Sequence, residues 1–433
     1  MSTVTNVIEA DVRGDAGESG GERVLQAEPR TSGSDSSVAA AKAGDMSAIV
    51  VRDAVELEQF AAAWEELAAA ALEPNVFYEP WVLIEAFRAL AAGRDIQFVL
   101  IFAPNPAWEH GPRVLCGVFP LERKRGYRGL PLRNLSLWKH KYCPLCTPIV
   151  RADRARETML AFFDWLASAG HGCSVMEFRH IPGDGRFHQL LVDCFDQRAR
   201  LSFVSNCFTR AVFKPAASAD SYLGAALSAK HRKALLRKEK RLAESGGLEY
   251  QELKPDEDPR TWIEKFVELE ASGWKGKEGT AVASSLEDRA FFEAVLQAAF
   301  RRRRLMMLAL RHNGRAIAFK CTFIAGSGAF ASKIAFDEQF AAFSPGLLLE
   351  MESIRRVHAR PEIQWVDSCA AADSMMFNRL WLDRRIIQSI VIGTGKPAGD
   401  FFVSLLPLFK WLRRFLAGLV GRSSRPRDRI DLG

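Results

Sequence analysis

Three strand-like runs in quick succession, followed at once by a helix start, constrain the fold of this chain more than any other feature. The runs are Leu305–His312, Ala316–Ile324 and Ala329–Phe336, and Asn313-Gly314 between the first two is a strong signal for a type I′ hairpin turn. The sequence therefore predicts an antiparallel meander whose last strand leads into a helix.

The helix start after the meander reads Ser344-Pro345-Gly346. Pro345 suits the first helical position, because its missing N–H would have no partner there, and Ser344 is predicted to cap the helix. Gly346 has no Cβ, which lets another group approach the backbone closely. Such a start presents free N–H groups and the positive end of the helix dipole, which suits a phosphate. The alternative is a capped helix that binds no ligand.

The composition is that of a soluble globular protein of two or three domains. The chain has 433 residues, of which 48% are hydrophobic and 26% charged. The formal net charge is +7, and the positive charge is concentrated in Lys230–Arg241, Arg301–Arg304 and the C-terminal tail. A basic balance of this size permits nucleic acid, an anionic membrane surface or a phosphorylated ligand as a partner, and does not choose between them.

The cysteines and the N-terminal segment indicate a cytoplasmic location. Eight cysteines are scattered without a regular framework, as expected for reduced thiols. His140, Cys143 and Cys146 have a spacing that could ligate zinc, but no second Cys/His cluster completes a tetrahedral site, so we expect no metal. The first 45 residues lack the apolar core of a signal peptide, and no run of about 18 apolar residues predicts a membrane-spanning helix.

The order of the predicted elements divides the chain into four parts. Residues 1–45 are rich in Gly, Ser, Ala and Asp and predict a disordered leader. Residues 46–213 predict one α/β domain, and residues 214–397 repeat its order of helices, antiparallel meander, helix and strands. Residues 398–433 form a separate basic tail. The predicted fold class is therefore mixed α/β, with a largely antiparallel sheet and two similar domains in tandem.

The tail predicts an amphipathic helix from Phe401 to Arg422, interrupted at Pro407. One helical face carries Lys410, Arg413 and Arg414, and the other carries Phe409, Leu412, Leu416 and Leu419. Such a helix either lies in a membrane interface, which would give peripheral membrane contact, or docks on the protein's own surface.

Four blocks of residues carry a resemblance to a known family. They are the basic helix Ser228–Leu242, the segment Glu268–Gly276, the hairpin Leu310–Cys321, and Phe336-Asp337 with Phe343–Leu348 and Val366–Ser368. In this order and spacing they resemble the acetyltransferase domain of the Gcn5-related (GNAT) superfamily. More closely, they resemble the double-domain BioF2-like or CelD-like acetyltransferases of bacteria, which are related to the Fem-type aminoacyl transferases. The resemblance covers about a third of the chain.

The resemblance implies two tandem acetyltransferase-like domains, the first of them structural, and acetyl-CoA or another acyl-CoA as co-substrate. The pantetheine arm would run between the strands that end near Phe336 and Asp367, which splay apart in this fold. The CoA diphosphate would lie on the helix start, at Phe343, Ser344, Gly346, Leu347 and Leu348. The usual pattern has two glycines close together in this loop, whereas Gly346 stands alone here.

Acyl transfer from a thioester needs a base for the proton of the acceptor, a backbone N–H that polarises the carbonyl, and an acid for the leaving thiolate. The candidate catalytic residues are Glu270, Asp367 and Asp337, and the candidate substrate-binding residues are Lys230, Arg232, Trp274 and Lys275. Structural alternatives exist: Asp367 could cap a turn, Glu270 could be a solvated helix residue, and Trp274 could belong to the core.

The resulting hypothesis is an acyl-CoA-dependent N- or O-acyltransferase that acetylates a sugar or a cell-envelope saccharide precursor, in the cytoplasm or at the inner face of the membrane. No nucleic-acid partner is expected, and no oligomeric state is predicted. One alternative is Fem-like aminoacyl transfer from tRNA, for which Lys230–Arg241 is too short to supply a long basic coiled coil. The other is a non-catalytic acetyltransferase-like subunit of a membrane-associated polysaccharide system.

Overall fold

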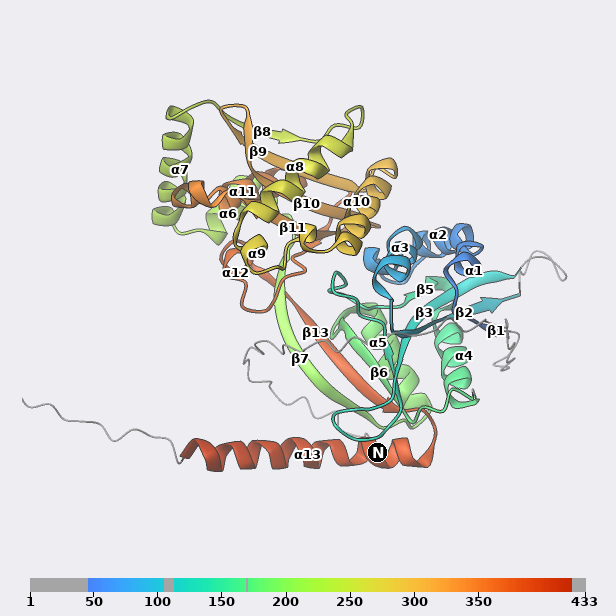
Figure 1. The fold of residues 1–433 in the computed structure, drawn as a ribbon. Helices are drawn as coiled ribbons and strands as arrows, with labels where there is room; N and C mark the ends of the chain where they lie inside the picture. The colour runs from blue at the N-terminus through green and yellow to red at the C-terminus, as the bar shows by residue number, and fades with distance from the viewer. Residues whose placement is uncertain (1–45, 105–112, 169, 423–433) are drawn as a thin grey trace, which may run out of the picture.

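One continuous sheet of 13 strands runs through both lobes of the protein (Figure 1). The computed structural model describes residues 46–104, 113–168 and 170–422, so the predicted leader lies outside the described residues. The strands follow the order β1-β2-β3-β4-β6-β13-β7-β12-β11-β10-β9-β8, with β5 paired to β3. Neighbours are antiparallel except β4 beside β6 and β11 beside β12. The predicted mixed α/β fold with a largely antiparallel sheet is confirmed.

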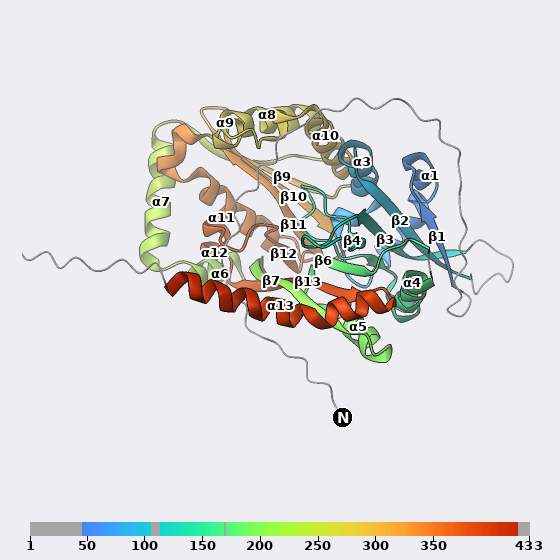
Figure 2. The same ribbon diagram turned by 60° about the horizontal axis from the view of Figure 1, so that its bottom comes forward.

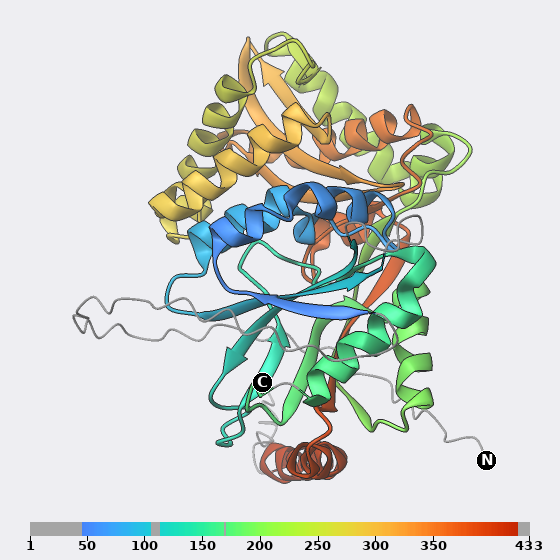
Figure 3. The same cartoon turned by 90° about the vertical axis from the view of Figure 1, so that its right-hand side faces the viewer.

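The N-terminal lobe has helices on both sides of its strands, as Figure 3 shows for α1–α3 on one side and α4 and α5 on the other. Its strands are β1 (Ser47–Val51), β2 (Asp95–Ala103), β3 (Val114–Lys124), β4 (Asn134–Leu137), β5 (Ile149–Val150) and β6 (Val175–Pro182). Its helices are α1 (Ala54–Glu58), α2 (Ala61–Ala69), α3 (Pro80–Leu90), α4 (Ala155–Ser168) and α5 (Gly185–Gln197), with 3-10 turns η1 (Val76–Tyr78) and η2 (Ala152–Arg154). Buried aromatic rings hold the layers together; Phe119 of β3 stacks on Phe162 of α4 with centroids 4.0 Å apart.

The C-terminal lobe contains the predicted meander. Its strands are β8 (Leu248–Glu252), β9 (Leu305–His312), β10 (Arg315–Ala325), β11 (Gly328–Phe336) and β12 (Trp365–Asp367). Its helices are α6 (Ala219–Ala226), α7 (Ala229–Glu244), α8 (Pro259–Ser272), α9 (Trp274–Lys277), α10 (Leu286–Arg301), α11 (Pro345–His358) and α12 (Met375–Leu380), with 3-10 turns η3 (Val282–Ser284) and η4 (Glu338–Phe343). Asn313 and Gly314 both have positive φ, 49° and 74°, as the type I′ turn requires.

Two long strands, β7 (Ser202–Phe213) and β13 (Asp383–Gly393), join the lobes. The two strands pair along most of their length, and the end of β7 pairs with β12 of the C-terminal lobe. On its other edge β13 pairs with β6. By sequence β13 belongs to residues 214–397, yet both of its neighbours come from residues 46–213, so the two expected domains share one sheet. Their boundaries remain a prediction.

The two faces of the C-terminal lobe are covered by different helices. On one face α8 packs through Trp262 and Phe266 against Phe319 of β10. On the other face α11 packs with α6 and α7 in a separate hydrophobic cluster. A buried ion pair fixes α11 on the sheet, because Lys320 of β10 donates to both carboxylate oxygens of Glu350, at 2.9 and 2.7 Å. The start of α11 is therefore held in a fixed place beside β11.

Helix α13 (Pro397–Arg422) follows β13 and runs along the edge of the molecule that lies away from β8–β10 (Figures 1 and 2). Its buried residues Phe402, Val403 and Leu406 pack on Val175 of β6 and Val391 of β13. The predicted interruption at Pro407 is wrong, since the helix continues through this residue. A proline removes one helical hydrogen bond, and the packing of the preceding turn offsets that loss.

Candidate active site

The two central strands of the C-terminal lobe separate after a short parallel pairing. Strand β11 pairs with β12 only over Gly328–Phe330. Beyond Phe330, β11 continues to Phe336, and no described strand pairs with this edge. The register with β10 shifts here, because Cys321 pairs with Lys333 and Thr322 with Ala331, which leaves Ser332 as an extra residue. The result is a bulged strand with an open backbone edge, in agreement with the splay that the resemblance implies.

The start of α11 lies beside this open edge, but Ser344 does not cap it as predicted. Ser344 adopts the left-handed conformation, with φ 57° and ψ 52°, and its side chain makes no capping hydrogen bond. The reason is the preceding 3-10 turn η4, which ends at Phe343, so that Ser344 alone connects this turn to α11. The N–H groups of Leu347 and Leu348 donate to the Ser344 carbonyl instead. Of the first-turn donors in the described structure, only the Gly346 N–H has no acceptor within the protein.

A lysine of the basic helix α7 reaches the start of α11. The Lys238 Nζ donates to the Ser344 Oγ at 2.8 Å. This cation and the positive end of the α11 dipole act at the same place, which makes the helix start a favourable position for an anion. Lys238 was not among the residues predicted from the sequence.

The five predicted cofactor-binding residues lie together at this helix start. Phe343, Ser344 and Leu347 are partly exposed, whereas Gly346 is buried and Leu348 belongs to the core. A Cβ added at Gly346 would lie 3.6 Å from the Phe336 ring and 3.8 Å from Ile334 of β11. Gly346 is therefore the point where the helix start approaches the open strand. The contacts of these residues with a cofactor remain a prediction.

Glu270 of α8 lies on the other face of β11, in a cluster with two lysines. Its Oε1 accepts hydrogen bonds from Lys275 Nζ at 2.9 Å and from Lys333 Nζ of β11 at 2.8 Å, and its Oε2 accepts the Val282 N–H at 2.9 Å. Only 3% of Glu270 is exposed, so the alternative of a solvated helix residue is excluded. Lys333, which sequence reasoning did not assign to the site, follows the bulge directly.

Charge and burial oppose each other in the Glu270 cluster. Burial raises the pKa of Glu270, but the Lys333 and Lys275 ammonium groups lower it more, and the net pKa lies below its usual value. Burial lowers the pKa of Lys333, and the attraction of Glu270 only partly opposes this. The pKa of Lys333 therefore moves closer to neutral pH, which favours exchange of its proton.

The N-terminal lobe contributes one wall of this cluster. Tyr142 stacks on Phe291 of α10, with ring centroids 5.3 Å apart, and the Lys333 Nζ lies 5.5 Å from the centre of the Tyr142 ring. The neighbouring Lys141 forms an ion pair with Asp288 of α10. A residue about 190 positions away in the chain thus borders Lys333, a placement that no local sequence pattern could indicate.

Asp367, at the end of β12, is enclosed by arginines. Arg210 of β7 donates from Nη2 to Asp367 Oδ2 at 2.7 Å, and its Nε lies 2.7 Å from Oδ1 without good hydrogen-bond alignment. Arg385 of β13 lies 3.3 Å from Oδ2, and the Cys369 N–H donates to Oδ1 at 2.9 Å. Burial raises the pKa of Asp367, but the two arginines lower it more, below its usual value. This geometry is that of a structural anion which ties three strands together and also caps a turn.

The remaining predicted residues divide between the two faces of the sheet. Asp337 caps η4 through the Gln339 N–H and pairs with Arg315, so its oxygens are engaged. Trp274 is 50% exposed beside Lys275, which excludes the core alternative.

Lys230 and Arg232 lie at the start of α7 on the opposite face, where Arg232 pairs with Asp220 at 3.1 Å. The structure brings Glu270, Trp274 and Lys275 together and does not bring Lys230 and Arg232 to them.

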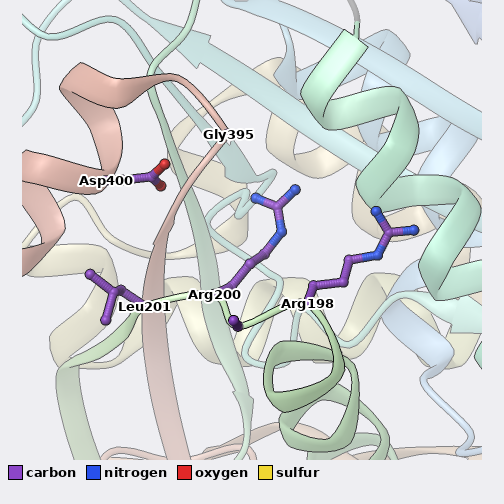
Figure 4. A pocket seen from close by; sticks show the side chains of 6 residues that line it. Arg198, Arg200, Leu201, Gly395 and Asp400 are labelled. Carbon is purple, nitrogen blue, oxygen red and sulfur yellow. The ribbon is translucent and has the colours of Figure 1, made fainter.

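A cavity near the start of α13 lies outside this region. It has a volume of about 440 Å³ and is lined by Arg198, Arg200, Leu201, Gly395 and Asp400, together with Ala199. Figure 4 shows the two guanidinium groups and the Asp400 carboxylate around it. Both arginines are engaged, Arg198 with Asp164 and Arg200 with the Gly393 carbonyl at 2.9 Å. None of the predicted site residues lines this cavity.

Among the described residues, no group of three or more His, Cys, Asp or Glu side chains could hold a metal ion. The predicted zinc-like spacing brings Cys143 and Cys146 within 3.8 Å of each other, but both thiols are buried. His140 is also buried, and burial is the main cause that lowers its pKa to about 3.

A splayed central strand pair with a helix start at its open edge, built into a two-lobed mixed sheet, is the arrangement that the resemblance to the GNAT superfamily implies. Residues 229–374 match the family described as the acetyltransferase (GNAT) domain, and this segment is therefore a GNAT-type acyltransferase domain. The match includes α7, the meander and the start of α11. No curated protein matches the chain.

Several solved structures are similar to this chain over most of its length. The crystal structure of FemX is similar over 82% of this chain and 99% of that chain, with 10% identity and a TM-score of 0.50. A tandem GNAT protein from the clavulanic acid biosynthesis pathway is similar over 81% and 99%, with 12% identity and a TM-score of 0.40. L-PGS from Bacillus licheniformis is similar over 82% and 95%, with 13% identity and a TM-score of 0.41. At these identities the likeness concerns the fold alone.

Proposed function

We propose that the protein is an acyl-CoA-dependent N- or O-acyltransferase that transfers an acetyl group to a sugar or a cell-envelope saccharide precursor. The observation that carries the proposal is the open edge of β11, which lies between the start of α11 on one face and the Glu270 cluster on the other. One face is suited to the diphosphate of CoA, and the other carries groups that can exchange protons. We also propose that the protein works at the cytoplasmic face of a membrane, in peripheral contact with it.

In this proposal the chain positions the thioester and accepts the proton that the acceptor loses. The diphosphate lies on the α11 start, near Gly346 and Lys238, with Phe343, Ser344, Leu347 and Leu348 around it. An unpaired backbone N–H of β11 beyond Phe330 polarises the thioester carbonyl. The acceptor's amine or hydroxyl attacks that carbonyl and the C–S bond breaks. The acceptor's proton passes into the Glu270–lysine cluster, and the same cluster returns one proton to the leaving thiolate.

Of the three predicted carboxylates, we favour Glu270 as the proton acceptor. Its partners are two lysine ammonium groups that can themselves exchange protons, and the Lys275 side chain is 24% exposed. The oxygens of Asp367 and Asp337 are instead engaged by arginines and by turn N–H groups. Trp274 and Lys275 line the acceptor side of the cluster.

Calorimetric titration with acetyl-CoA tests the proposed co-substrate, and we expect saturable binding together with a rise in the unfolding temperature. Transfer of radiolabel from acetyl-CoA to a panel of amino sugars and saccharide precursors then tests the acceptor. Absence of both heat and thermal shift would reject the acyltransferase proposal. Binding without transfer to any saccharide would reject the saccharide acceptor and leave the co-substrate in place.

The substitution Glu270→Gln is expected to lower kcat about a hundredfold, because the cluster loses its anionic proton acceptor. Acetyl-CoA affinity should stay close to that of the parent, since the diphosphate position lies on the other face of β11. The matched control is Glu268→Gln on the same helix, where the side chain is exposed. An unchanged kcat in folded Glu270→Gln would remove Glu270 from the mechanism. The unfolding temperature of the variant checks that any loss of activity is not caused by misfolding.

A further inference from the structure

Helix α13 has a second apolar face that the protein leaves uncovered. Phe401, Leu408, Phe409, Trp411, Leu412 and Phe415 are exposed by 43% to 67%, and we call them the outward face. Most of them recur at intervals of three, four or seven residues, as expected for one side of a helix. Apart from Phe409, which follows Phe402 by seven residues, they lie on the side opposite to Phe402, Val403 and Leu406, which dock on the sheet.

This concentration of exposed apolar side chains is peculiar to α13. No other described helix or strand has more than one exposed large hydrophobic residue. Trp411 and Phe415 stack on each other, with centroids 5.5 Å apart and ring planes 12° apart, so these two rings form one aromatic surface. A contiguous exposed apolar surface of this kind marks a binding surface, because isolated exposed apolar residues are the normal condition.

The charge of the helix favours an anionic membrane surface as the partner. Its sequence contains Lys410, Arg413, Arg414 and Arg422 against a single acid, Asp400. A second copy of the chain would bring two such basic helices together, which electrostatic repulsion disfavours. An aromatic and aliphatic face combined with a basic one is typical of helices that lie in the plane of a membrane interface. No described helix is long and apolar enough to cross a membrane.

We infer that α13 docks on an anionic lipid bilayer, with its outward face inserted at the boundary between headgroups and acyl chains. This inference specifies the partner of the peripheral membrane contact proposed above, and it holds whether or not the acyl transfer is correct. The helix runs along the edge of the molecule that lies away from β8–β10 (Figure 1), so docking leaves the candidate active site uncovered.

The test is co-sedimentation of the full chain with vesicles of phosphatidylcholine that contain about a quarter phosphatidylglycerol. We expect strong binding, weaker binding to pure phosphatidylcholine, and at least a tenfold loss of binding in the double variant Trp411→Glu and Phe415→Glu. The matched control is Leu236→Glu and Leu286→Glu, which changes two exposed apolar residues elsewhere and should bind as the parent does.

Three results would overturn the inference: no binding of the parent chain, equal binding of the outward-face variant, or equal binding to neutral vesicles. Loss of a dimer in the outward-face variant, without any vesicle binding by the parent, would assign the face to a second copy instead. Acetyl-CoA affinity and unfolding temperature, measured on the same proteins, keep the outcomes separate. A variant that no longer binds vesicles but keeps the acetyl-CoA affinity and the unfolding temperature of the parent is folded, and its substitutions affect membrane docking alone.

Discussion

The substitution Gly346→Glu is expected to abolish measurable acetyl-CoA binding. It places a carboxylate at the start of α11, where we propose that the CoA diphosphate lies. Two like charges about 4 Å apart repel by about 4 kcal/mol at the effective dielectric of a protein surface, which corresponds to a loss of affinity on the order of a thousandfold. Calorimetric titration measures the effect directly.

The control for this prediction is Gly346→Ala. Its added Cβ would lie 3.6 Å from Phe336, 3.8 Å from Ile334 and 3.9 Å from the Met376 sulfur, which are ordinary van der Waals contacts. Alanine should therefore bind acetyl-CoA nearly as the parent does. Because a buried glutamate could also disturb folding, Lys238→Glu provides a second test through a side chain that is only partly buried. If both charged variants remain folded and keep full affinity, the diphosphate site lies elsewhere.

The substitution Asp367→Asn is expected to destabilise the fold by about 4 kcal/mol. Asp367 is fully buried, and its loss leaves Arg210, whose side chain is 2% exposed, and Arg385 without their shared anion. Removal of one partner from a buried ion pair costs about 3–5 kcal/mol, because the remaining charge stays desolvated. Urea unfolding at neutral pH measures the loss. The matched control is Asp383→Asn, which removes a partly exposed carboxylate on β13 and should leave stability nearly unchanged.

The pH dependence of this effect follows from the pKa of Asp367, which lies below its usual value because Arg210 and Arg385 outweigh the effect of burial. A carboxyl whose pKa is lower in the folded chain stabilises the fold fully above its unfolded pKa of about 3.9. That contribution is lost as the pH falls through the folded value. The difference between parent and Asp367→Asn should therefore be constant near neutrality and shrink below about pH 4. Intact stability with lost activity would instead support Asp367 as the catalytic base.

Local features of the fold could be predicted because local chemistry decides them. The Asn313-Gly314 turn depends on two residues that tolerate positive φ, and both adopt it. Pro345 begins α11 as predicted, since a first helical position needs no N–H. Ser344 does not cap the helix as predicted, because it follows η4, a turn that the sequence did not reveal. Ser344 is left-handed there, and its hydroxyl makes no capping hydrogen bond.

The site could be predicted only in part, because its members come from distant segments. The basic helix was recognised, but the lysine that reaches α11 is Lys238 rather than Lys230 or Arg232. Only the packing of α7 on the lobe determines which side of this helix faces α11. Lys333 is the only charged residue of β11, and that isolated charge was a signal that could have indicated it. Tyr142 carried no such signal, since it meets Lys333 only through the contact between the lobes.

The sequence by itself determined the meander, the helix start that follows it and the family that they resemble, because periodicity and turn chemistry act over a few residues. Only the tertiary structure decided that β13 returns to pair with β6 and β7, which encloses Asp367 between two arginines. It also decided that α13 uses one apolar face for the protein and leaves the other exposed. Strand partners and burial depend on contacts between segments far apart in the chain, and no local pattern records them.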